Sequence, residues 1–349
     1  MPKILHITPH LGGGVGRVLL NYFQAAHGGP NQHGAACLDG ANAAAKARAE
    51  SIGLSLFEHL GRNHEALFEL VKAADLVVTH WWNHPLLSDL LWRGNWPAAR
   101  VLLWSHVSGA LPPQVITPYL AAFPDIFAAA SPVTLGLPVF SGRAEPRRGI
   151  APPQINGDST IASGNGLDSP ITFRPRLLFS SAGVGHVARA EPRPHQGFRI
   201  GYLGTVDYAK MHPDFIDMSL AAQLPPDVVF TVAGGPEHEA LKREVDRRGL
   251  AGRFEIIGPI DDVEGFLAEL DVFGYPLNPE HYGTGEQVLI EAQAAGAPPV
   301  VLGGGAEEYV VEDGLTGLVA KSPEDYGACL ARLYHQRDLR SRLAAQAGR

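Results

Sequence analysis

The chain has 349 residues, which is enough for two domains of ordinary size. Hydrophobic residues make up 45% of it and charged residues 18%, so it can build packed cores and is not a disordered protein. The formal net charge is -8 and no long basic run occurs, which argues against a nucleic-acid partner.

Other broad features concern metals, redox state and membranes. Cys37 and Cys329 stand far apart, and no Cys/His spacing typical of a zinc site occurs, so we expect a reduced, cytoplasmic protein without a metal. The start of the chain lacks the pattern of a cleaved signal peptide. No apolar run approaches the roughly 20 residues that span a bilayer. Peripheral contact with a membrane remains open.

In the first half of the chain, short apolar runs alternate with helix-like segments. Residues 3–8 are predicted to form a buried strand, followed by a glycine cluster and a helix at 18–26. Further strands are predicted at 34–38, 54–59, 76–80, 101–104 and 126–130, with a helix at 65–74. This alternation predicts a parallel sheet covered by helices. His80, His106 and Ser131 follow or end predicted strands, at the edge where such sheets bind ligands.

The pattern is interrupted in the middle of the chain. Residues 141–176 are rich in Pro, Gly, Ser and Arg, which predicts a long surface loop or insertion. A short strand is predicted at 177–180, and residues 191–197 have the composition of a linker between domains.

A second alternating series follows this linker. Strands are predicted at 199–203, 228–233, 254–257, 272–275 and 299–302, and helices at 213–222, 237–248, 263–270 and 286–295. The predicted class is α/β, with two Rossmann-like, doubly wound parallel-sheet lobes, residues 1–195 and 198–349, facing a cleft.

The first candidate site is the glycine cluster between the first strand and the first helix. Gly12, Gly13 and Gly14 let the backbone approach a ligand, and the helix N-terminus can bind an anion. A dinucleotide fingerprint is disfavoured, because Arg17 stands where that motif needs glycine and no acidic residue follows about 20 residues later. A plain tight turn is the alternative.

The second candidate opens the second lobe. Lys210 follows the predicted strand and the segment Gly204-Thr205, where its ammonium could neutralise a diphosphate. A solvated surface lysine is the alternative interpretation.

The third candidate is a loop that runs into a helix, Tyr282-Gly-Thr-Gly-Glu286-Gln-Val-Leu-Ile-Glu291. Glu286 and Glu291 are five apart, so they point in different directions on a helix and are expected to have separate tasks. The Glu286 carboxylate could simply interact favourably with the positive end of the helix dipole. Glu291 lies in an apolar run, where a buried carboxylate needs a partner such as a ligand hydroxyl pair, unless the position is exposed.

The sequence contains 15 histidines, and two of them stand beside tryptophans. His80 precedes Trp81 and Trp82, and His106 follows Trp104. These residues could form polar groups and stacking faces at a sugar site, although a lone histidine is more often structural. No spacing supports a metal site.

Taken together, the chain resembles retaining glycosyltransferases of the GT-B fold, of the family 4 type (glycosyl transferases group 1). The motifs that carry the resemblance span both lobes: the first strand with Gly12-Gly13-Gly14, Ser131-Pro132-Val133-Thr134, residues 181–185, residues 202–204 with Lys210, residues 232–236, 254–258 and 271–273, Glu291-Ala292, and residues 296–300 and 313–317.

The resemblance implies that the second lobe binds a nucleotide-diphosphate sugar and that the first lobe faces the acceptor. It places Lys210 near the diphosphate, Glu291 at the ribose, the first glycine loop near the phosphates and the reacting centre, and His106 near the sugar. The expected catalytic residues are His106, Lys210 and Glu286. The expected donor-binding residues are Gly12, Gly13, Gly14, Gly204, Thr205, Lys210, Gly235, Gly283, Thr284, Gly285, Glu286 and Glu291.

The sequence departs from the family pattern at two positions of this expected site. Thr205 stands where an arginine usually follows Gly204, so one positive charge is missing. Gly283 stands eight residues before Glu291, where the family has a glutamate. Glu280 or Glu286 is expected to replace it, and Glu286 is preferred because it lies at the junction of loop and helix.

The expected reaction is the transfer of a sugar from the donor to an acceptor hydroxyl, with retention of anomeric configuration and without a cofactor or metal. The expected partners are the donor and a glycan, lipid-linked or small-molecule acceptor. The alternatives are an enzyme similar to nucleotide-sugar 2-epimerases, a non-catalytic nucleotide-sugar-binding protein, and a Rossmann-fold oxidoreductase, which Arg17 disfavours.

Overall fold

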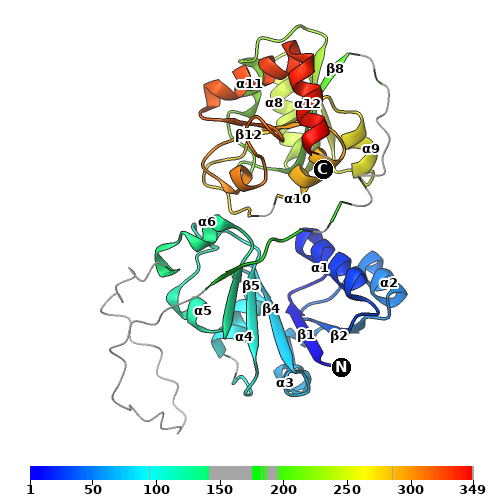
Figure 1. Ribbon diagram of the computed structural model, residues 1–349, viewed down its shortest axis with the longest axis vertical. Helices are drawn as coiled ribbons and strands as arrows, with labels where there is room; N and C mark the ends of the chain where they lie inside the picture. Colours follow the sequence, from blue (N-terminus) through cyan, green and yellow to red (C-terminus); the bar gives the residue numbers. More distant parts are fainter. Residues whose placement is uncertain are drawn as a thin grey trace.

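The computed structural model describes residues 1–93, 95–140, 175–181, 183–184, 187, 195, 197–284 and 286–347. It consists of two lobes, one above the other in Figure 1, each built on its own sheet with helices packed around it. The predicted α/β class with two Rossmann-like lobes is therefore confirmed.

The first lobe is built on a seven-stranded parallel sheet in the order β3-β2-β1-β4-β5-β6-β7. The strands are β1 (Lys3–Thr8), β2 (Gln32–Cys37), β3 (Ser55–Phe57), β4 (Leu76–Trp81), β5 (Val101–Ser105), β6 (Ile126–Ala129) and β7 (Arg176–Leu177). The order reverses between β1 and β4, because β2 lies on one side of β1 and β4 on the other. Ligands of doubly wound sheets bind beyond the carboxyl ends of the strands at this switch point.

Most of the α-helices described in the first lobe directly follow a glycine or a small polar residue. They are α1 (Gly13–Ala26), α2 (Ala43–Ser51), α3 (His64–Lys72), α4 (Pro85–Arg93), α5 (Pro118–Ala122) and α6 (Pro132–Leu135). The side chains of Asn42, Asn63, Thr117 and Ser131 accept backbone N–H groups at the starts of α2, α3, α5 and α6. Such caps satisfy N–H groups that have no partner inside the helix.

The second lobe is built on a six-stranded parallel sheet in the order β10-β9-β8-β11-β12-β13. Its strands are β8 (Phe198–Val206), β9 (Val228–Pro236), β10 (Phe254–Gly258), β11 (Val272–Tyr275), β12 (Pro299–Leu302) and β13 (Leu318–Ala320), and its helices are α7 (Phe215–Leu220), α8 (His238–Arg247), α9 (Val263–Ala268), α10 (Gln287–Ala294), α11 (Pro323–His335) and α12 (Arg337–Ala347). The order again reverses, here between β8 and β11, which places a second switch point after β8.

The elements differ from the sequence predictions in a few places. Helix α1 begins at Gly13 and not at residue 18, so Gly13 and Gly14 form its first turn. Strand β13 was not predicted, because it has only three residues. Strand β7 begins at Arg176, so the irregular stretch ends earlier than predicted. Residues 141–174 of that stretch and most of 191–197 lie outside the described residues. Among the helices that the structure describes, none is both long and apolar enough to cross a membrane.

Candidate functional site

The glycine loop of the first lobe follows β1 at the switch point. Gly12 is the N-cap of α1, and no side chain caps the N–H groups of the first turn. Gly13 has a φ of +64°, a left-handed conformation that favours glycine. A Cβ atom added at Gly13 or Gly14 would meet nothing within 4 Å, and both residues are exposed. The start of α1 therefore presents backbone N–H groups to open space.

The two lobes touch through the loop that precedes α10. The Thr284 hydroxyl donates to the carbonyl oxygen of His106 at 3.0 Å, and the Ser108 N–H donates to the carbonyl oxygen of Tyr282 at 3.0 Å. His106 and Ser108 directly follow β5, so the carboxyl edge of the first sheet faces the second lobe. The structure thus brings two predicted site residues, His106 and Thr284, into contact through backbone and hydroxyl atoms.

A side-chain ion pair also joins the lobes. The Arg17 guanidinium, on α1, contacts the carboxylate of Glu291 on α10. The Glu291 side chain is 2% exposed and that of Arg17 is 39% exposed. Glu291 therefore contacts a protein cation, as well as the Gln287 amide at 3.4 Å, in the place where the resemblance implies a ribose.

Lys210 and Glu286 form the central ion pair of the second lobe. The Nζ atom of Lys210 lies 3.0 Å from Oε2 of Glu286, and the Tyr275 hydroxyl donates to the same oxygen at 2.7 Å. Burial, the largest single influence, would lower the pKa of Lys210, but the charge and hydrogen bond of Glu286, together with smaller contributions from Tyr282 and Glu307, raise that pKa overall. Burial would likewise raise the pKa of Glu286, while Lys210 and His281 hold it below its usual value. Both groups are therefore charged at neutral pH.

Glu286 differs from its predicted placement in the first turn of a helix. It is the N-cap of α10, and its side chain points away from the helix N–H groups toward Lys210 and Tyr275. Glu280 is exposed, so the structure places Glu286 and not Glu280 beside Lys210. The separate directions predicted for Glu286 and Glu291 are confirmed, since one contacts Lys210 and the other Arg17.

A second pair of buried side chains supports the same loop. His281 Nε2 lies 2.9 Å from Oε1 of Glu307, and His281 Nδ1 accepts the N–H of Gly283 at 2.9 Å. Because a backbone N–H only donates, Nδ1 is the acceptor nitrogen and the ring proton lies on Nε2, facing Glu307. Ligand atoms of His281, Glu286 and Glu307 lie within 4.8 Å of one another, a spacing that could hold a metal ion.

The remaining predicted donor residues lie along β8 and β9. Gly204 lies beside Tyr275, because a Cβ atom there would be 3.3 Å from the tyrosine hydroxyl oxygen. The carbonyl oxygen of Thr205 accepts from the Tyr202 hydroxyl at 2.7 Å. Gly235 faces His238 and not the ion pair, since its Cβ would be 3.6 Å from His238 Nδ1. Gly285 lies outside the described residues.

Comparison with known proteins identifies the lobe that carries this ion pair. Residues 187–349 match the sequence profile of the family described as "Glycosyl transferases group 1". These residues belong to the glycosyl transferases group 1 family. The group 1 lobe thus contains Lys210, Glu286 and Glu291, together with the His281–Glu307 pair.

Curated relatives match part of the chain. A D-inositol 3-phosphate glycosyltransferase of Thermomonospora curvata is 30% identical over 193 residues, which cover 51% of this chain and 44% of that protein. The lipopolysaccharide core biosynthesis glycosyltransferase LpsE of Rhizobium meliloti is 29% identical over 125 residues, which cover 35% of this chain and 36% of that protein. The matches therefore span less than half the length of these relatives.

Solved structures match the whole chain. The Anabaena protein Alr3699/HepE, in complex with UDP-glucose, superposes with a TM-score of 0.71 at 15% identity, covering 100% of this chain and 94% of that one. A glycosyltransferase from Rickettsia africae superposes with a TM-score of 0.72 at 12% identity, covering 99% and 92%. The two lobes together therefore have the GT-B fold, with the group 1 lobe as the second half.

Opposite the group 1 lobe, His106 ends a row of four histidines that crosses the first sheet. The row consists of His33, His6, His80 and His106, and its nitrogen–nitrogen distances are 3.1, 3.0 and 2.9 Å in that order. The other ring nitrogen of His106 lies 3.1 Å from the Ser180 hydroxyl oxygen. Both ring nitrogens of His106 are thus engaged within the first lobe. A sugar contact through either nitrogen would require one of these hydrogen bonds to break.

Burial keeps this histidine row neutral. It lowers the pKa of His6 and of His106 to about 3, and the pKa of His80 well below its usual value. Neighbouring histidines lower the pKa of His6 and His80 further. Each ring can therefore accept at one nitrogen and donate at the other, which satisfies the row without a counter-ion.

The three tryptophans expected as stacking faces at a sugar site lie in different surroundings. Trp81 and Trp104 lie on opposite faces of the sheet, because Trp81 pairs in register with Ser105 and side chains alternate along a strand. Trp104 lines an apolar cavity of about 480 Å³ with Leu102 and Val78. Trp82 packs against His10 at a ring distance of 5.5 Å. Trp81 and Trp104 therefore cannot belong to one stacking surface.

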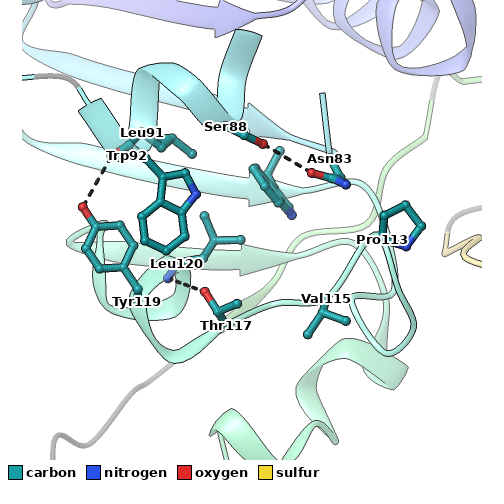
Figure 2. A pocket seen from close by; sticks show the side chains of 10 residues that line it. Asn83, Ser88, Leu91, Trp92, Pro113, Val115, Thr117, Tyr119 and Leu120 are labelled. Carbon is teal, nitrogen blue, oxygen red and sulfur yellow. Dashed lines mark hydrogen bonds between the residues drawn. The ribbon is translucent and has the colours of Figure 1, made fainter. Parts of the chain in front are cut away.

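Trp81 belongs to a separate pocket of about 210 Å³ on the other face of the sheet. Figure 2 shows this pocket between α4 and the segment 113–120, with the rings of Trp92 and Tyr119 side by side. These two rings stack at 4.5 Å and are about half exposed. The Tyr119 hydroxyl donates to the carbonyl oxygen of Leu91 at 3.4 Å.

Sequence reasoning missed several residues that the fold brings to the group 1 site. Arg17, Tyr275, His281 and Glu307 were not predicted as site residues, although the first three each contact one that was and Glu307 contacts His281. The histidine row carried a detectable signal, because His6 and His80 lie within predicted strands and His106 directly follows one. The partners of Arg17 and Glu307 carried no such signal, since they are distant in sequence.

Proposed function

We propose that the protein is a glycosyltransferase that transfers a sugar from a nucleotide-diphosphate sugar to an acceptor hydroxyl, with retention of anomeric configuration. The observation that carries this proposal is the Lys210–Glu286 pair at the switch point of the group 1 lobe, in a structure where the ion pair of Arg17 with Glu291 joins the glycine-rich helix α1 to the same lobe. A lysine and open helix N–H groups on two sides of one interface suit an anionic leaving group.

Departure of a diphosphate requires stabilisation of developing negative charge. Lys210 supplies a fixed cation, and Glu286 holds it in place through a 3.0 Å contact. The N–H groups of the first turn of α1 add hydrogen-bond donors from the other lobe. Because these groups are positioned before the reaction, they need little reorganisation as charge develops.

The relatives and neighbours support the classes of donor and acceptor. The Anabaena neighbour is described in complex with UDP-glucose, and LpsE is named for lipopolysaccharide core biosynthesis. We therefore propose a nucleotide-sugar donor and a glycan, lipid-linked or small-molecule acceptor held on the first-lobe side. We also propose that the protein is cytoplasmic and that it acts in peripheral contact with a membrane.

We propose further that the donor binds without a metal. The one trio of described residues with suitable spacing is His281, Glu286 and Glu307. Its Glu286 oxygen already accepts from Lys210 and Tyr275, and His281 directs a ring proton toward Glu307. A divalent ion there would compete with an ammonium and would require the loss of that proton. Activity that persists in EDTA would support this, and activity that returns only with a divalent ion would refute it.

The test of the function is a thermal-shift screen of the protein against UDP-, GDP-, ADP- and TDP-sugars. A ligand at 100 times its Kd adds about 2.7 kcal/mol to the free energy of unfolding, which is readily measured. One donor class should raise the melting temperature, and the Lys210→Ala variant should lose that shift. A folded wild-type protein that responds to none of them would refute the proposal.

A further inference from the structure

The Arg17–Glu291 ion pair lies at the interface between the two lobes, with Arg17 on α1 and Glu291 on α10. Glu291 is almost completely buried, while the Arg17 side chain is 39% exposed. The arginine can therefore leave without unpacking a core, whereas the glutamate is fixed on α10 among its neighbours. Of the two partners, Arg17 is the mobile one.

The residues around this interface offer too little positive charge for an anionic ligand. Lys210 is already matched by Glu286, and Arg17 by Glu291, while Glu307 adds another carboxylate. This group of described residues thus has more carboxylates than cations. A diphosphate would bind poorly here unless one cation were released from its carboxylate partner.

Helix geometry places Arg17 where it can make that exchange. Arg17 and Gly13 are four residues apart on α1, so they lie on the same face of the helix. Gly13 is at the open N-terminal turn, where an added Cβ would meet nothing within 4 Å. The guanidinium can therefore swing toward this open space, where helix N–H groups also point.

We propose that Arg17 is a donor-binding residue that exchanges Glu291 for the diphosphate when the nucleotide sugar binds. The planar guanidinium then donates to phosphate oxygens, and the released Glu291 carboxylate accepts from hydroxyls of the nucleotide. This inference rests on the proposed function. It assigns to the first lobe a cation that completes the diphosphate site of the second.

The experiment measures the affinity of four proteins for a nucleoside diphosphate and for the matching nucleoside. The proteins are the wild type, Arg17→Ala, Arg17→Lys and the control Arg48→Ala, which removes a guanidinium that hydrogen-bonds Asn21 and Gln24. Both ligands carry the nucleobase of the nucleotide sugar that raises the melting temperature of the wild type in the thermal-shift screen. Titration calorimetry gives the diphosphate Kd, and competition gives the nucleoside Kd.

Arg17→Ala should weaken diphosphate binding about tenfold or more, as expected for a charge-assisted hydrogen bond, without weakening nucleoside binding. Arg17→Lys should restore part of the loss, and Arg48→Ala should bind as the wild type does. Equal diphosphate affinity in Arg17→Ala would overturn the inference. Tighter binding of both ligands by Arg17→Ala would also overturn it, because Arg17 would then only compete with the ligand for Glu291. Equal weakening of both ligands would overturn it as well, because the role of Arg17 would then be structural. A wild type that binds no nucleoside diphosphate would instead refute the proposed function.

Discussion

The Nζ atom of Lys210 lies 3.0 Å from Oε2 of Glu286, in a part of the second lobe where the glutamate side chain is 2% exposed. The two residues belong to different loops, one after β8 and the other before α10. Their pairing fixes both loops at the switch point of the sheet. The pair therefore has consequences for stability as well as for donor binding.

Removing the lysine should destabilise the second lobe. Lys210→Ala leaves the buried Glu286 carboxylate with the Tyr275 hydroxyl as a donor but without its cation, and loss of one partner of a buried pair costs about 3–5 kcal/mol. Urea denaturation measures this loss. The double variant Lys210→Met/Glu286→Leu should cost less, because no unpaired charge remains, and the exposed Lys242→Ala should change stability little. Equal losses in the single and double variants would contradict the prediction.

Close backbone packing makes Gly234 irreplaceable. A Cβ atom at Gly234 would stand 1.8 Å from the carbonyl oxygen of Gly204 on the neighbouring strand, and its φ is +124°. We expect Gly234→Ala to yield insoluble protein or a second lobe that has lost its cooperative unfolding transition. Gly252→Ala is the matched control, because its Cβ would meet nothing within 4 Å and its φ is not positive. Circular dichroism of both variants tests this, and a folded Gly234→Ala of wild-type stability would count against the packing described.

The histidine row should make the first lobe sensitive to acid. The pKa of His6 and of His106 is about 3 in the folded protein, against 6.5 for the ordinary side chain. The unfolded chain therefore binds protons below about pH 6.5 that the folded chain takes up only near pH 3, so stability is full above 6.5 and falls as the pH decreases toward 3.

Each fully neutral histidine should contribute a loss of about 1.4 kcal/mol per pH unit in that range. Urea denaturation between pH 7.5 and 5 measures the slope. Nitrogen NMR of the imidazole rings gives a direct check, since these histidines should not titrate between pH 8 and 5 in the folded state. Ring signals of His6 and His106 that move with a midpoint near 6.5 would show that the row is not neutral by burial.

Glu307 should act on the donor site through His281. Glu307→Ala removes the carboxylate that lies 2.9 Å from His281 Nε2, which loosens the ring that also accepts the Gly283 N–H. We expect weaker donor binding, by about fivefold to tenfold if one hydrogen bond is lost. Glu307→Gln keeps an oxygen acceptor and should retain most of the affinity. The exposed Glu312→Ala controls for the loss of one negative charge. Titration calorimetry with the donor measures these affinities. A loss of affinity in Glu307→Gln as large as that in Glu307→Ala would mean that the negative charge of Glu307 is needed, and not merely an oxygen atom at that position.

Much of the fold could be predicted from local patterns along the chain. Strands such as β1 and β11 have the same bounds as the predicted ones, because an apolar run between turn residues carries its own signal. The three-residue β13 carried too little signal to be predicted. The start of α1 was placed too late, because glycines disfavour a helix locally while a first turn tolerates them.

The candidate site could be predicted only by residue type and position in the chain. Lys210, Glu286 and Glu291 stood out as charged residues beside predicted strand and helix ends. Their partners could not be found, because Arg17 is 274 residues from Glu291, and such pairs depend on how the lobes dock. The strand register also decides how the tryptophans lie, since the alternation of side chains places Trp81 and Trp104 on opposite faces of one sheet.

The sequence by itself determined two α/β lobes, because the spacing of apolar residues fixes each strand and helix locally. It also determined which glycines and charged residues follow the strands. Only the tertiary structure decided that Glu286 faces Lys210 and that Glu291 faces Arg17. The physical reason is that a buried charge takes whichever partner the packed backbone brings within hydrogen-bond distance, and that distance is set by the whole fold.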